Sequence, residues 1–305
     1  MDLVADIGGT NTRLALAENG RPLDESTRSF RNRQFTSFDD PLGAFLSEMG
    51  NPTPDAVCVA IAGPVKGSHG KLTNLDWDFE TDRIAQVSRA KHAVLINDLA
   101  ALGHALPHLH PNQTKTLRPF GPGDRRNGQS FVLGLGTGVN IATNMGDGRV
   151  LEAEAGHAGL PTQIHGQLAD AIGEEAVSRF PSLEELFAGR GLAALHGCMS
   201  GVSVPAHEVI ARPDATAQKC VALYARLLGL ALRELILYYL PLEGVYFAGS
   251  VARGVLGVAQ EPFLGALGQP HLMQDIIAAP SVSLILDDAA ALHGCAARIQ
   301  ADKAA

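Results

Sequence analysis

The chain has 305 residues, which corresponds to about two domains of ordinary size, and its 46% hydrophobic and 18% charged residues are typical of a globular protein. Its 32 acidic and 24 basic residues give a net charge of −8, so the chain has no general attraction to nucleic acid or anionic membranes. The 33 glycines follow no three-residue period, which excludes a collagen-like structure and raises the question of which turns need them.

Membrane, secreted and zinc-binding classes are also disfavoured. The most apolar stretch, residues 220–240, is interrupted by Arg226, Arg233 and Glu234, so its apolar runs are far shorter than the roughly 18 residues of a membrane span. The first ten residues lack the pattern of a signal peptide. The four cysteines form no CxxC pair, so neither a zinc knuckle nor a dense disulfide framework is expected. We expect a reduced, soluble, cytoplasmic protein.

Short apolar runs alternate with longer helical patterns along the chain. Strands separated by helices are typical of a parallel sheet with crossover helices, and they predict an α/β fold. The expected strands cover residues 3–7, 14–17, 56–62, 93–96, 131–135, 245–248 and 282–286, and the expected helices cover residues 37–49, 98–106, 167–179, 182–187, 215–240 and 287–300.

One pattern occurs twice. Residues 7–16 (IGGTNTRLAL) and 135–143 (LGTGVNIAT) each predict a strand, a glycine-threonine turn and a second strand. Each copy is followed by a strand that ends in a polar or glycine turn and enters a helix, at residues 95–102 and 245–254. The repeat favours two related α/β halves, although chance recurrence of glycine-rich hairpins explains it about equally well. The Pro-, Gly- and His-rich stretch 107–124 is the expected connection.

The turn after the first strand, DIGGTN, is a candidate phosphate site. Gly8 and Gly9 permit positive φ and close approach of the backbone, so successive N–H groups can converge on a phosphate. Asp6, at the end of the strand, can reach a magnesium ion or its water. A Gly-Gly hairpin turn with nothing bound is the competing interpretation. The chain contains neither GxxxxGK[ST] nor GxGxxG, so P-loop and Rossmann sites are unsupported.

Two candidate segments lie where helices begin, so helix capping competes with chemistry. Asn97-Asp98 ends an apolar strand, where ligands of parallel α/β sheets bind, and Asp98 there can accept a hydroxyl proton during phosphoryl transfer. From spacing alone, an Asx N-cap of the following helix is the better interpretation. Ser182 followed by Glu185 matches a capping box, which explains Glu185 well and Glu184 partly.

Two further segments could contact a sugar or a nucleotide. Glu154 and His157 lie three residues apart across a glycine and can together bind vicinal hydroxyls, although a histidine satisfied within its loop is commoner. Gly249-Ser250 precedes a helix and suits a nucleotide phosphate or ribose, or else is an ordinary strand-to-helix turn.

These segments belong to an ordered set of short motifs: DIGGTN (6–11), IAGPVKG (61–67), LTNLDW (72–77), IND (96–98), GLGTG (134–138), EAGH (154–157), SLEELFAGRGL (182–192) and VYFAGS (245–250). Each is modest alone. Together, over essentially the whole chain, they resemble the bacterial glucokinase family, in its proteobacterial branch within the sugar kinase/Hsp70/actin superfamily.

The resemblance implies an α/β fold of two RNase H-like (actin-like ATPase) domains with a cleft between them. Residues 1–108 plus 289–305 would form the small domain and residues 109–288 the large one. The family also implies closure of the domains on the sugar, a homodimer, and a C-terminal helix that returns to the first domain. No nucleic-acid or membrane partner is expected.

The resemblance further implies phosphoryl transfer from ATP, with Mg²⁺, to the 6-hydroxyl of D-glucose, with Asp98 as the general base. The residues expected to bind the sugar are Asn74, Asn97, Asp98, Glu154, His157 and Glu184. Those expected to bind ATP are Ala5, Asp6, Ile7, Gly8, Gly9, Thr10, Gly136, Thr137, Gly138, Gly249 and Ser250, with Asp6 also reaching Mg²⁺ through water.

Some positions depart from the family pattern. Ala155 replaces the first glycine of the usual EGGH, and its methyl group could shift the loop and alter sugar preference. Ser250 stands where a second glycine is usual. The related ROK kinases and repressors carry a zinc-binding cysteine cluster that this chain lacks, and we expect no N-terminal DNA-binding module. The alternatives to a glucokinase are a kinase for another hexose or an N-acyl hexosamine, and a non-catalytic sugar-binding regulator.

Overall fold

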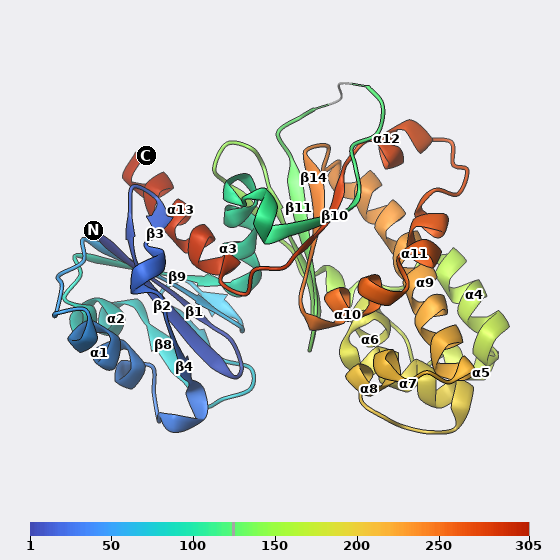
Figure 1. Ribbon diagram of the computed structural model, residues 1–305, viewed down its shortest axis with the longest axis horizontal. Coiled ribbons are helices and arrows are strands. Elements are labelled where there is room, and N and C mark those ends of the chain that lie inside the picture. The colour runs from blue at the N-terminus through green and yellow to red at the C-terminus, as the bar shows by residue number, and fades with distance from the viewer. Residues whose placement is uncertain (124–125, 305) are drawn as a thin grey trace. The chain divides into compact units, whose positions relative to one another are not determined.

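The structure is a computed structural model that describes residues 1–123 and 126–304, and the chain divides into two compact units (Figure 1). The expected division instead placed residues 1–108 and 289–305 in one domain and 109–288 in the other. No sequence pattern indicated that Asp147–Val150, a short segment within 109–288, groups with the first unit. Unit 1 consists of Met1–His110, Asp147–Val150 and Asp287–Ala305, and unit 2 of Pro111–Gly146 and Leu151–Leu286.

A mixed sheet forms the centre of unit 1, with the strand order β3-β2-β1-β5-β9 and with β4 paired to β2. β1 (Asp2–Ile7) is parallel to β5 (Ala56–Ile61), β5 is parallel to β9 (His92–Asn97), and β2 (Asn11–Glu18) is antiparallel to β1. β1 and β5 are buried along their whole length. Because both faces of this sheet are covered, its central strands carry nearly continuous apolar runs.

Alternate residues of β1 face two hydrophobic cores, as the period of a strand requires. Leu3 packs in a core with side chains of α1 (Asp39–Glu48) and α2 (Thr81–Ser88). Val4 packs in a second core, which includes side chains of α3 (Asp98–Ala105) and α13 (Ala290–Ala304). Strand β1 is therefore held by packing on both faces, and this fixes the start of the turn that follows it.

Helices α3 and α13 approach each other very closely. At Gly294 of α13, a Cβ atom would lie 1.7 Å from the carbonyl oxygen of Ala101 in α3. Only glycine fits at this crossing, because a carbonyl oxygen of a helix cannot move away without loss of backbone hydrogen bonds. The crossing thus fixes α3, the helix that begins at Asp98.

Unit 2 contains the second large sheet, with the strand order β10-β15-β14-β11-β12-β13. β11 (Ser130–Leu135), β14 (Gly244–Ala248) and β15 (Val282–Ile285) are parallel, and β12 (Val139–Asn144) is antiparallel to β11. The longest helix, α9 (Ala215–Tyr239), is buried along much of its length and packs with the other helices in the core of this unit.

The two sheets repeat one connectivity, which agrees with the repeat seen in the sequence. The order β2-β1-β5-β9 has the same sequence of antiparallel and parallel neighbours as β12-β11-β14-β15. However, the two strand–helix junctions that the sequence paired are not equivalent. β14, which precedes Gly249, is the direct neighbour of β11, whereas β9, which precedes Asp98, is the second neighbour of β1. The topological counterpart of β14 is β5.

Two expectations about elements are wrong. The helix expected over residues 167–179 is instead α4 (Thr162–Ile172) followed by α5 (Glu174–Val177), because Gly173 between them has φ +84° and ends the first helix. The stretch 107–124 is more than a connection, since it contains β10 (Thr114–Arg118), which pairs antiparallel with β15. Residue 124, the last of that stretch, lies outside the described residues.

The C-terminal helix begins later than expected, at Ala290 rather than at residue 287. The Asp287 carboxylate accepts a hydrogen bond from the Ala289 N–H (2.7 Å), and this turn comes before the first helical residue. Nothing in residues 1–123 and 126–304 is a helix both long and apolar enough to cross a membrane. The remaining elements are β3 (Arg21–Pro22), β4 (Arg28–Arg31), β6 (Val65–Lys66), β7 (His69–Lys71), β8 (Asp78–Glu80), β13 (Val150–Glu152), α6 (Leu183–Phe187), α7 (Gly189–Ser200), α8 (Ala206–Ala211), α10 (Ser250–Val258), α11 (Gln260–Leu267) and α12 (Gln274–Ala278), with short 3₁₀ turns at Asp24–Ser26, Asn32–Gln34, Leu106–His108, Pro111–Gln113 and Ala155–His157.

Candidate active site

The glycine turn between β1 and β2 is held from outside by Asn32, a residue that the sequence did not single out. Its side-chain amide donates to the Gly8 carbonyl (2.8 Å), and its backbone N–H donates to the Thr10 carbonyl (3.0 Å). Its side-chain oxygen accepts from the Thr12 hydroxyl (2.8 Å). Asn32 is almost completely buried. The turn therefore has a fixed shape, with its carbonyl groups occupied by Asn32.

Asn97 and Asp98 lie at the junction of β9 and α3, as expected, and both cap the helix. The side-chain oxygen of Asn97 and one carboxylate oxygen of Asp98 each accept from the Leu99 N–H at 2.9 Å. The Asn97 amide also donates to the Gly63 carbonyl (3.1 Å). Capping and chemistry are compatible here, because the Leu99 N–H engages one oxygen of Asp98 and fixes the orientation of the carboxylate.

The pKa values of the Asp6 and Asp98 carboxyl groups are shifted toward neutral pH. Burial, together with the neighbouring charge of Asp6, raises the pKa of Asp98 to about 7, although the Leu99 N–H favours the charged form. Burial raises the pKa of Asp6 to about 6 against the opposing effect of Arg13, whose Nη1 lies 3.4 Å from the carboxylate. Asp98 keeps some solvent exposure, so a ligand hydroxyl can reach it.

Asn74 lies against the glycine turn between β1 and β2. A Cβ atom on Gly9 would be 3.0 Å from the side-chain nitrogen of Asn74. The Leu72 N–H donates to the Trp77 carbonyl (3.1 Å), which closes the loop that carries Asn74. The structure thus brings together in unit 1 the predicted sugar residue Asn74 and the predicted phosphate turn.

In unit 2, the turn between β11 and β12 contacts the predicted sugar residue Glu184. The Val139 N–H donates to Glu184 Oε2 (2.9 Å), and a Cβ atom on Gly138 would lie 2.8 Å from the same oxygen. Within the turn the Gly136 N–H donates to the Gly138 carbonyl (3.0 Å), and the Gly189 N–H donates to the Gly136 carbonyl (2.9 Å). A side chain at Gly138 would therefore have to displace the Glu184 carboxylate.

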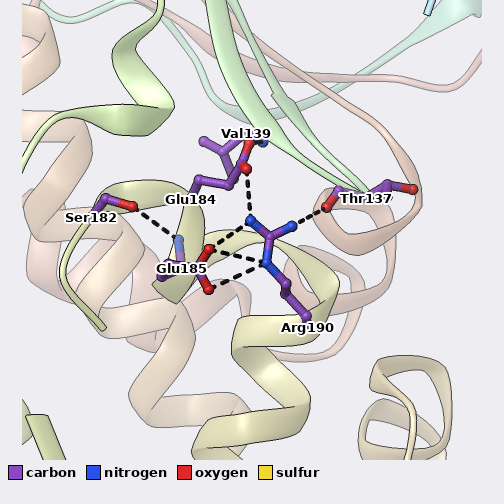
Figure 2. A network of polar contacts seen from close by, with 6 residues as sticks. All are labelled: Thr137, Val139, Ser182, Glu184, Glu185 and Arg190. Carbon is purple, nitrogen blue, oxygen red and sulfur yellow. Dashed lines mark hydrogen bonds and ion pairs between the residues drawn. The ribbon is translucent and has the colours of Figure 1, made fainter. Parts of the chain in front are cut away.

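Arg190 connects this turn with two glutamates, as Figure 2 shows. Its guanidinium donates to Glu184 Oε1 (2.6 Å), to Glu185 Oε1 (2.8 Å) and to the Thr137 carbonyl (3.1 Å). The Ser182 hydroxyl accepts from the Glu185 N–H (3.3 Å), so the expected cap is present, but the Glu185 carboxylate pairs with Arg190 instead of closing a capping box. Sequence reasoning missed Arg190.

The contacts of Glu184 and Glu185 keep both side chains ionised. Burial raises the pKa of Glu184, but the Val139 N–H and Arg190 outweigh burial, and the pKa is below its usual value. The hydrogen bond from Arg190 also lowers the pKa of Glu185. These carboxylates are acceptors of hydrogen bonds and do not exchange protons near neutral pH.

Glu154 and His157 belong to the same cluster of unit 2. Asn140 organises their loop, because its side-chain oxygen accepts from the Ala155 N–H (3.0 Å) and its amide donates to Glu154 Oε2 (3.1 Å). Glu154 and His157 are exposed, and His157 lies close enough to lower the pKa of Glu184. The methyl group of Ala155 packs against the hydrophobic core.

Gly156 and Gly249 allow the segments of this cluster to meet. A Cβ atom on Gly156 would lie 1.9 Å from the Val139 carbonyl oxygen, and one on Gly249 would lie 2.2 Å from the Leu135 carbonyl oxygen. Gly249 also has φ +96°, which other residues adopt at a cost in energy. Ser250, the exposed first residue of α10, is therefore held beside the strand that leads into the turn.

The two units thus each carry a polar cluster built on a glycine turn. Unit 1 has backbone N–H groups and the carboxyl groups of Asp6 and Asp98, whose pKa values are close to neutral pH. Unit 2 has the ionised carboxylates of Glu184 and Glu185 and a histidine. Asp6, near the end of β1, fits a divalent cation that is also bound by phosphate oxygens, since Mg²⁺ is commonly held by one or two carboxylates plus substrate phosphates. Among residues 1–123 and 126–304 there is no group of three or more His, Cys, Asp and Glu side chains suited to a metal ion.

This chain is similar to known glucokinases in both sequence and fold. Residues 3–302 match the model of the family described as Glucokinase. A glucokinase of Nitrobacter hamburgensis is 28% identical over 96% of this chain and 95% of its own, and one of Caulobacter sp. (strain K31) is 28% identical over 99% and 96%. A crystal structure of glucokinase from an Antarctic psychrotroph has a TM-score of 0.82 at 28% identity and covers 97% of each chain.

A ROK hexokinase from Thermus thermophilus, 23% identical, shares the fold with a TM-score of 0.69 over 97% of this chain and 96% of its own. The expected α/β fold of the actin-like ATPase type is confirmed by these likenesses. The ordered motifs, the duplicated sheet and the family match over nearly the whole length lead to one conclusion: the chain belongs to the glucokinase family.

Proposed function

We propose that this protein transfers the terminal phosphoryl group of ATP to the 6-hydroxyl of D-glucose, with Asp98 as the general base. The observation that carries the proposal is the Asp98 carboxylate, which directly follows the parallel strand β9, is oriented by the Leu99 N–H and has a pKa raised to about 7. Relatives that are 28% identical over nearly the whole chain are named glucokinases. A ROK glucokinase from Streptomyces griseus, which shares the fold at 20% identity with a TM-score of 0.59, was crystallised with glucose and AMPPNP.

Asp98 suits this step because its pKa lies near the pH of a cell. A general base is most effective when it is largely deprotonated yet still basic enough to take the proton. The Leu99 N–H engages Oδ1 of Asp98, so the other oxygen is the natural acceptor for the hydroxyl proton of the sugar. Once protonated, Asp98 no longer repels the charge of Asp6.

The remaining sugar hydroxyls would be bound by residues of both units. Asn74 and Asn97 supply amides from unit 1, and Glu154, His157 and Glu184 supply acceptors and an imidazole from unit 2. Glu184 already has one oxygen on the Val139 N–H and the other on Arg190. A carboxylate has about four acceptor positions, so Glu184 can also accept from a sugar hydroxyl.

The phosphates of ATP would be bound by backbone N–H groups of the glycine turns at residues 5–10 and 136–138, with Gly249 and Ser250 near the nucleoside. Mg²⁺, when bound with ATP, neutralises phosphate charge during the transfer. Asp6 would hold it through water from the end of β1. Dependence on Mg²⁺, a homodimer and a cytoplasmic location belong to the same proposal and rest on the family resemblance.

The nearest alternative is a kinase for another hexose or an N-acyl hexosamine. The observation that favours it is Ala155, whose packed methyl group stands between Glu154 and Gly156 in the proposed sugar loop. A non-catalytic sugar-binding regulator is the third candidate, and it gives no reason for a base at Asp98.

Formation of ADP from ATP, measured by a coupled assay with a panel of hexoses and N-acyl hexosamines, separates these functions. We expect the highest kcat/KM with D-glucose. Strong preference for another sugar would contradict the glucokinase assignment, and no turnover with any sugar would contradict the kinase assignment. Mannose and N-acetylglucosamine are the informative competitors, because they differ from glucose at the 2-position only.

A further inference from the structure

Unit 1 has a small open pocket that the site described above does not explain. It has a volume of about 150 Å³ and is lined by Gly9, Thr10, Arg31, Arg33 and Leu75. Gly9 and Thr10 belong to the proposed phosphate turn, and Leu75 follows the proposed sugar residue Asn74. Neither arginine was predicted to take part in binding.

Arg31 and Arg33 are fixed beside the turn by the residue between them. Arg31 ends β4 and is paired with Asn11 of β2, directly after the glycine turn. Asn32 anchors the segment through its hydrogen bonds to Gly8 and Thr10. Two guanidinium groups are thus attached to a rigid backbone at one side of the pocket, which lowers the entropy lost when they bind a ligand.

No side chain within residues 1–123 and 126–304 forms an ion pair or hydrogen bond with the guanidinium of either arginine. Arg28, the other arginine of β4, differs: it donates to Glu48 Oε1 (2.5 Å) and to the Glu25 carbonyl (2.9 Å). Exposed arginines with no partner are often simply hydrated, so the absence of a partner does not by itself indicate a ligand. The position of the two arginines does. Arg31 and Arg33 line one pocket with the glycine turn, and Arg28 does not.

Two arginines and two residues of the glycine turn line this pocket. The carbonyl groups of Gly8 and Thr10 accept hydrogen bonds from Asn32, whereas the N–H groups of Gly9 and Thr10 have no acceptor in the described part of the chain. No carboxylate lines the pocket. Guanidinium groups beside backbone N–H groups that have no acceptor favour a phosphate, which offers acceptors and a double negative charge.

We propose that Arg31 and Arg33 bind a phosphate group of a ligand in the proposed reaction. Two sources share this chemistry: the terminal phosphate of the nucleoside triphosphate and the phosphate ester of the sugar product. The inference rests on the proposed function, which supplies both ligands, and it adds two residues that determine their affinity.

The test compares the double variant Arg31→Gln/Arg33→Gln with Arg28→Gln, a matched control on the same strand as Arg31. We expect the double variant to raise the KM for ATP, or the inhibition constant of glucose 6-phosphate, by about tenfold, because charge-assisted hydrogen bonds to phosphate are lost. The KM for glucose should stay within about twofold of wild type, and Arg28→Gln should change none of these constants. A change in the ATP constant identifies the triphosphate as the ligand, and a change in the product constant identifies the sugar phosphate.

Two outcomes overturn the inference: constants for both phosphate ligands within about twofold of wild type, or an equal rise in the KM for glucose. Titration calorimetry with ATP, glucose 6-phosphate and inorganic phosphate repeats the comparison without turnover. If the wild type phosphorylates no hexose, the proposed function fails. The titrations still decide the role of the arginines, because loss of phosphate binding in the double variant alone would support it.

Discussion

The polar clusters of the two units both contain carboxyl groups, but the pKa values of these groups are shifted in opposite directions. In unit 1, burial raises the pKa of Asp6 to about 6 and that of Asp98 to about 7. In unit 2, hydrogen bonds from the Val139 N–H and Arg190 keep the pKa of Glu184 below its usual value. Local environment, rather than residue type, makes one set suited to proton transfer and the other to permanent acceptance of hydrogen bonds.

The largest expected effect is on the buried carboxylate of unit 1. Replacement Asp98→Asn keeps the size of the side chain and its acceptor for the Leu99 N–H but removes the base. We expect kcat to fall by about 10²- to 10⁴-fold with little change in the KM for glucose, as loss of general-base catalysis predicts. Steady-state assays with glucose and ATP measure both constants. Turnover within about tenfold of wild type would show that Asp98 is not the base.

The next effect concerns the close contacts that assemble the cluster of unit 2. Gly249→Ala would place a Cβ atom 2.2 Å from the Leu135 carbonyl oxygen at φ +96°, and we expect a loss of about 2–4 kcal/mol in the free energy of unfolding. Gly136→Ala is the matched control, because nothing lies within 4 Å of its Cβ position. Urea denaturation measures both. Equal loss in the two variants would mean that crowding at Gly249 is relieved by backbone movement.

This contrast also shows what could be predicted from the sequence. The positions of Asp98, Glu184 and the glycine turns follow from short motifs, because each motif lies at the end of a strand or the start of a helix. The helix boundary at Gly173 was missed because the apolar pattern continues across it into α5. The strand Thr114–Arg118 was missed because the surrounding proline and glycine residues suggested a connection.

The residues that hold the site together were not predictable. Asn32 contacts Gly8 across 24 residues of sequence, and Arg190 contacts Thr137 across 53. Such contacts depend on how distant segments pack, and neither an isolated asparagine nor an isolated arginine has a local pattern that indicates a partner. Local pattern locates the groups proposed to touch ligands, whereas packing determines which groups orient them.

The pH dependence of turnover tests the electrostatic state of unit 1. Only the deprotonated form of Asp98 can act as the base, so we expect kcat to fall about tenfold per pH unit below about pH 7. Removal of the Asp6 charge by Asp6→Asn should lower the pKa of Asp98 and move this acid limb to lower pH, even if overall activity is reduced. An acid limb near pH 4 in the wild type would contradict the raised pKa.

The raised pKa of Asp98 should also make the stability of the protein depend on pH. The pKa of Asp98 in the folded chain, about 7, is higher than the ordinary aspartate value of 3.8 expected for the unfolded chain, so the folded state binds more protons between these values. The free energy of unfolding therefore decreases as pH rises from about 4 to 7. Asp98→Asn removes this loss and should stabilise the protein, relative to wild type, by on the order of 4 kcal/mol more at pH 8 than at pH 4. Denaturation at the two pH values measures the difference.

The smallest effect is expected at Arg190, a positioning residue. Its guanidinium bridges Glu184, Glu185 and the Thr137 carbonyl, so it joins the proposed sugar residue to the proposed phosphate turn. We expect Arg190→Ala to raise the KM for glucose by roughly tenfold and the KM for ATP by less, with a smaller change in kcat. Arg190→Lys should restore only part of the affinity, because an ammonium group cannot reproduce the planar fork of a guanidinium.

The matched control for Arg190 is Glu185→Gln, which weakens one ion pair of the same guanidinium but leaves its bonds to Glu184 and Thr137. Because Glu185 is not a proposed ligand and its ion pair is exposed, we expect nearly unchanged constants. Combination of Arg190→Ala with Glu184→Gln should raise the KM for glucose by less than the product of the single effects, since Arg190 acts on the sugar through Glu184. Independent, multiplicative effects would mean that Glu184 keeps its position without Arg190. In that case the Val139 N–H alone would account for the ionised state that distinguishes unit 2 from unit 1.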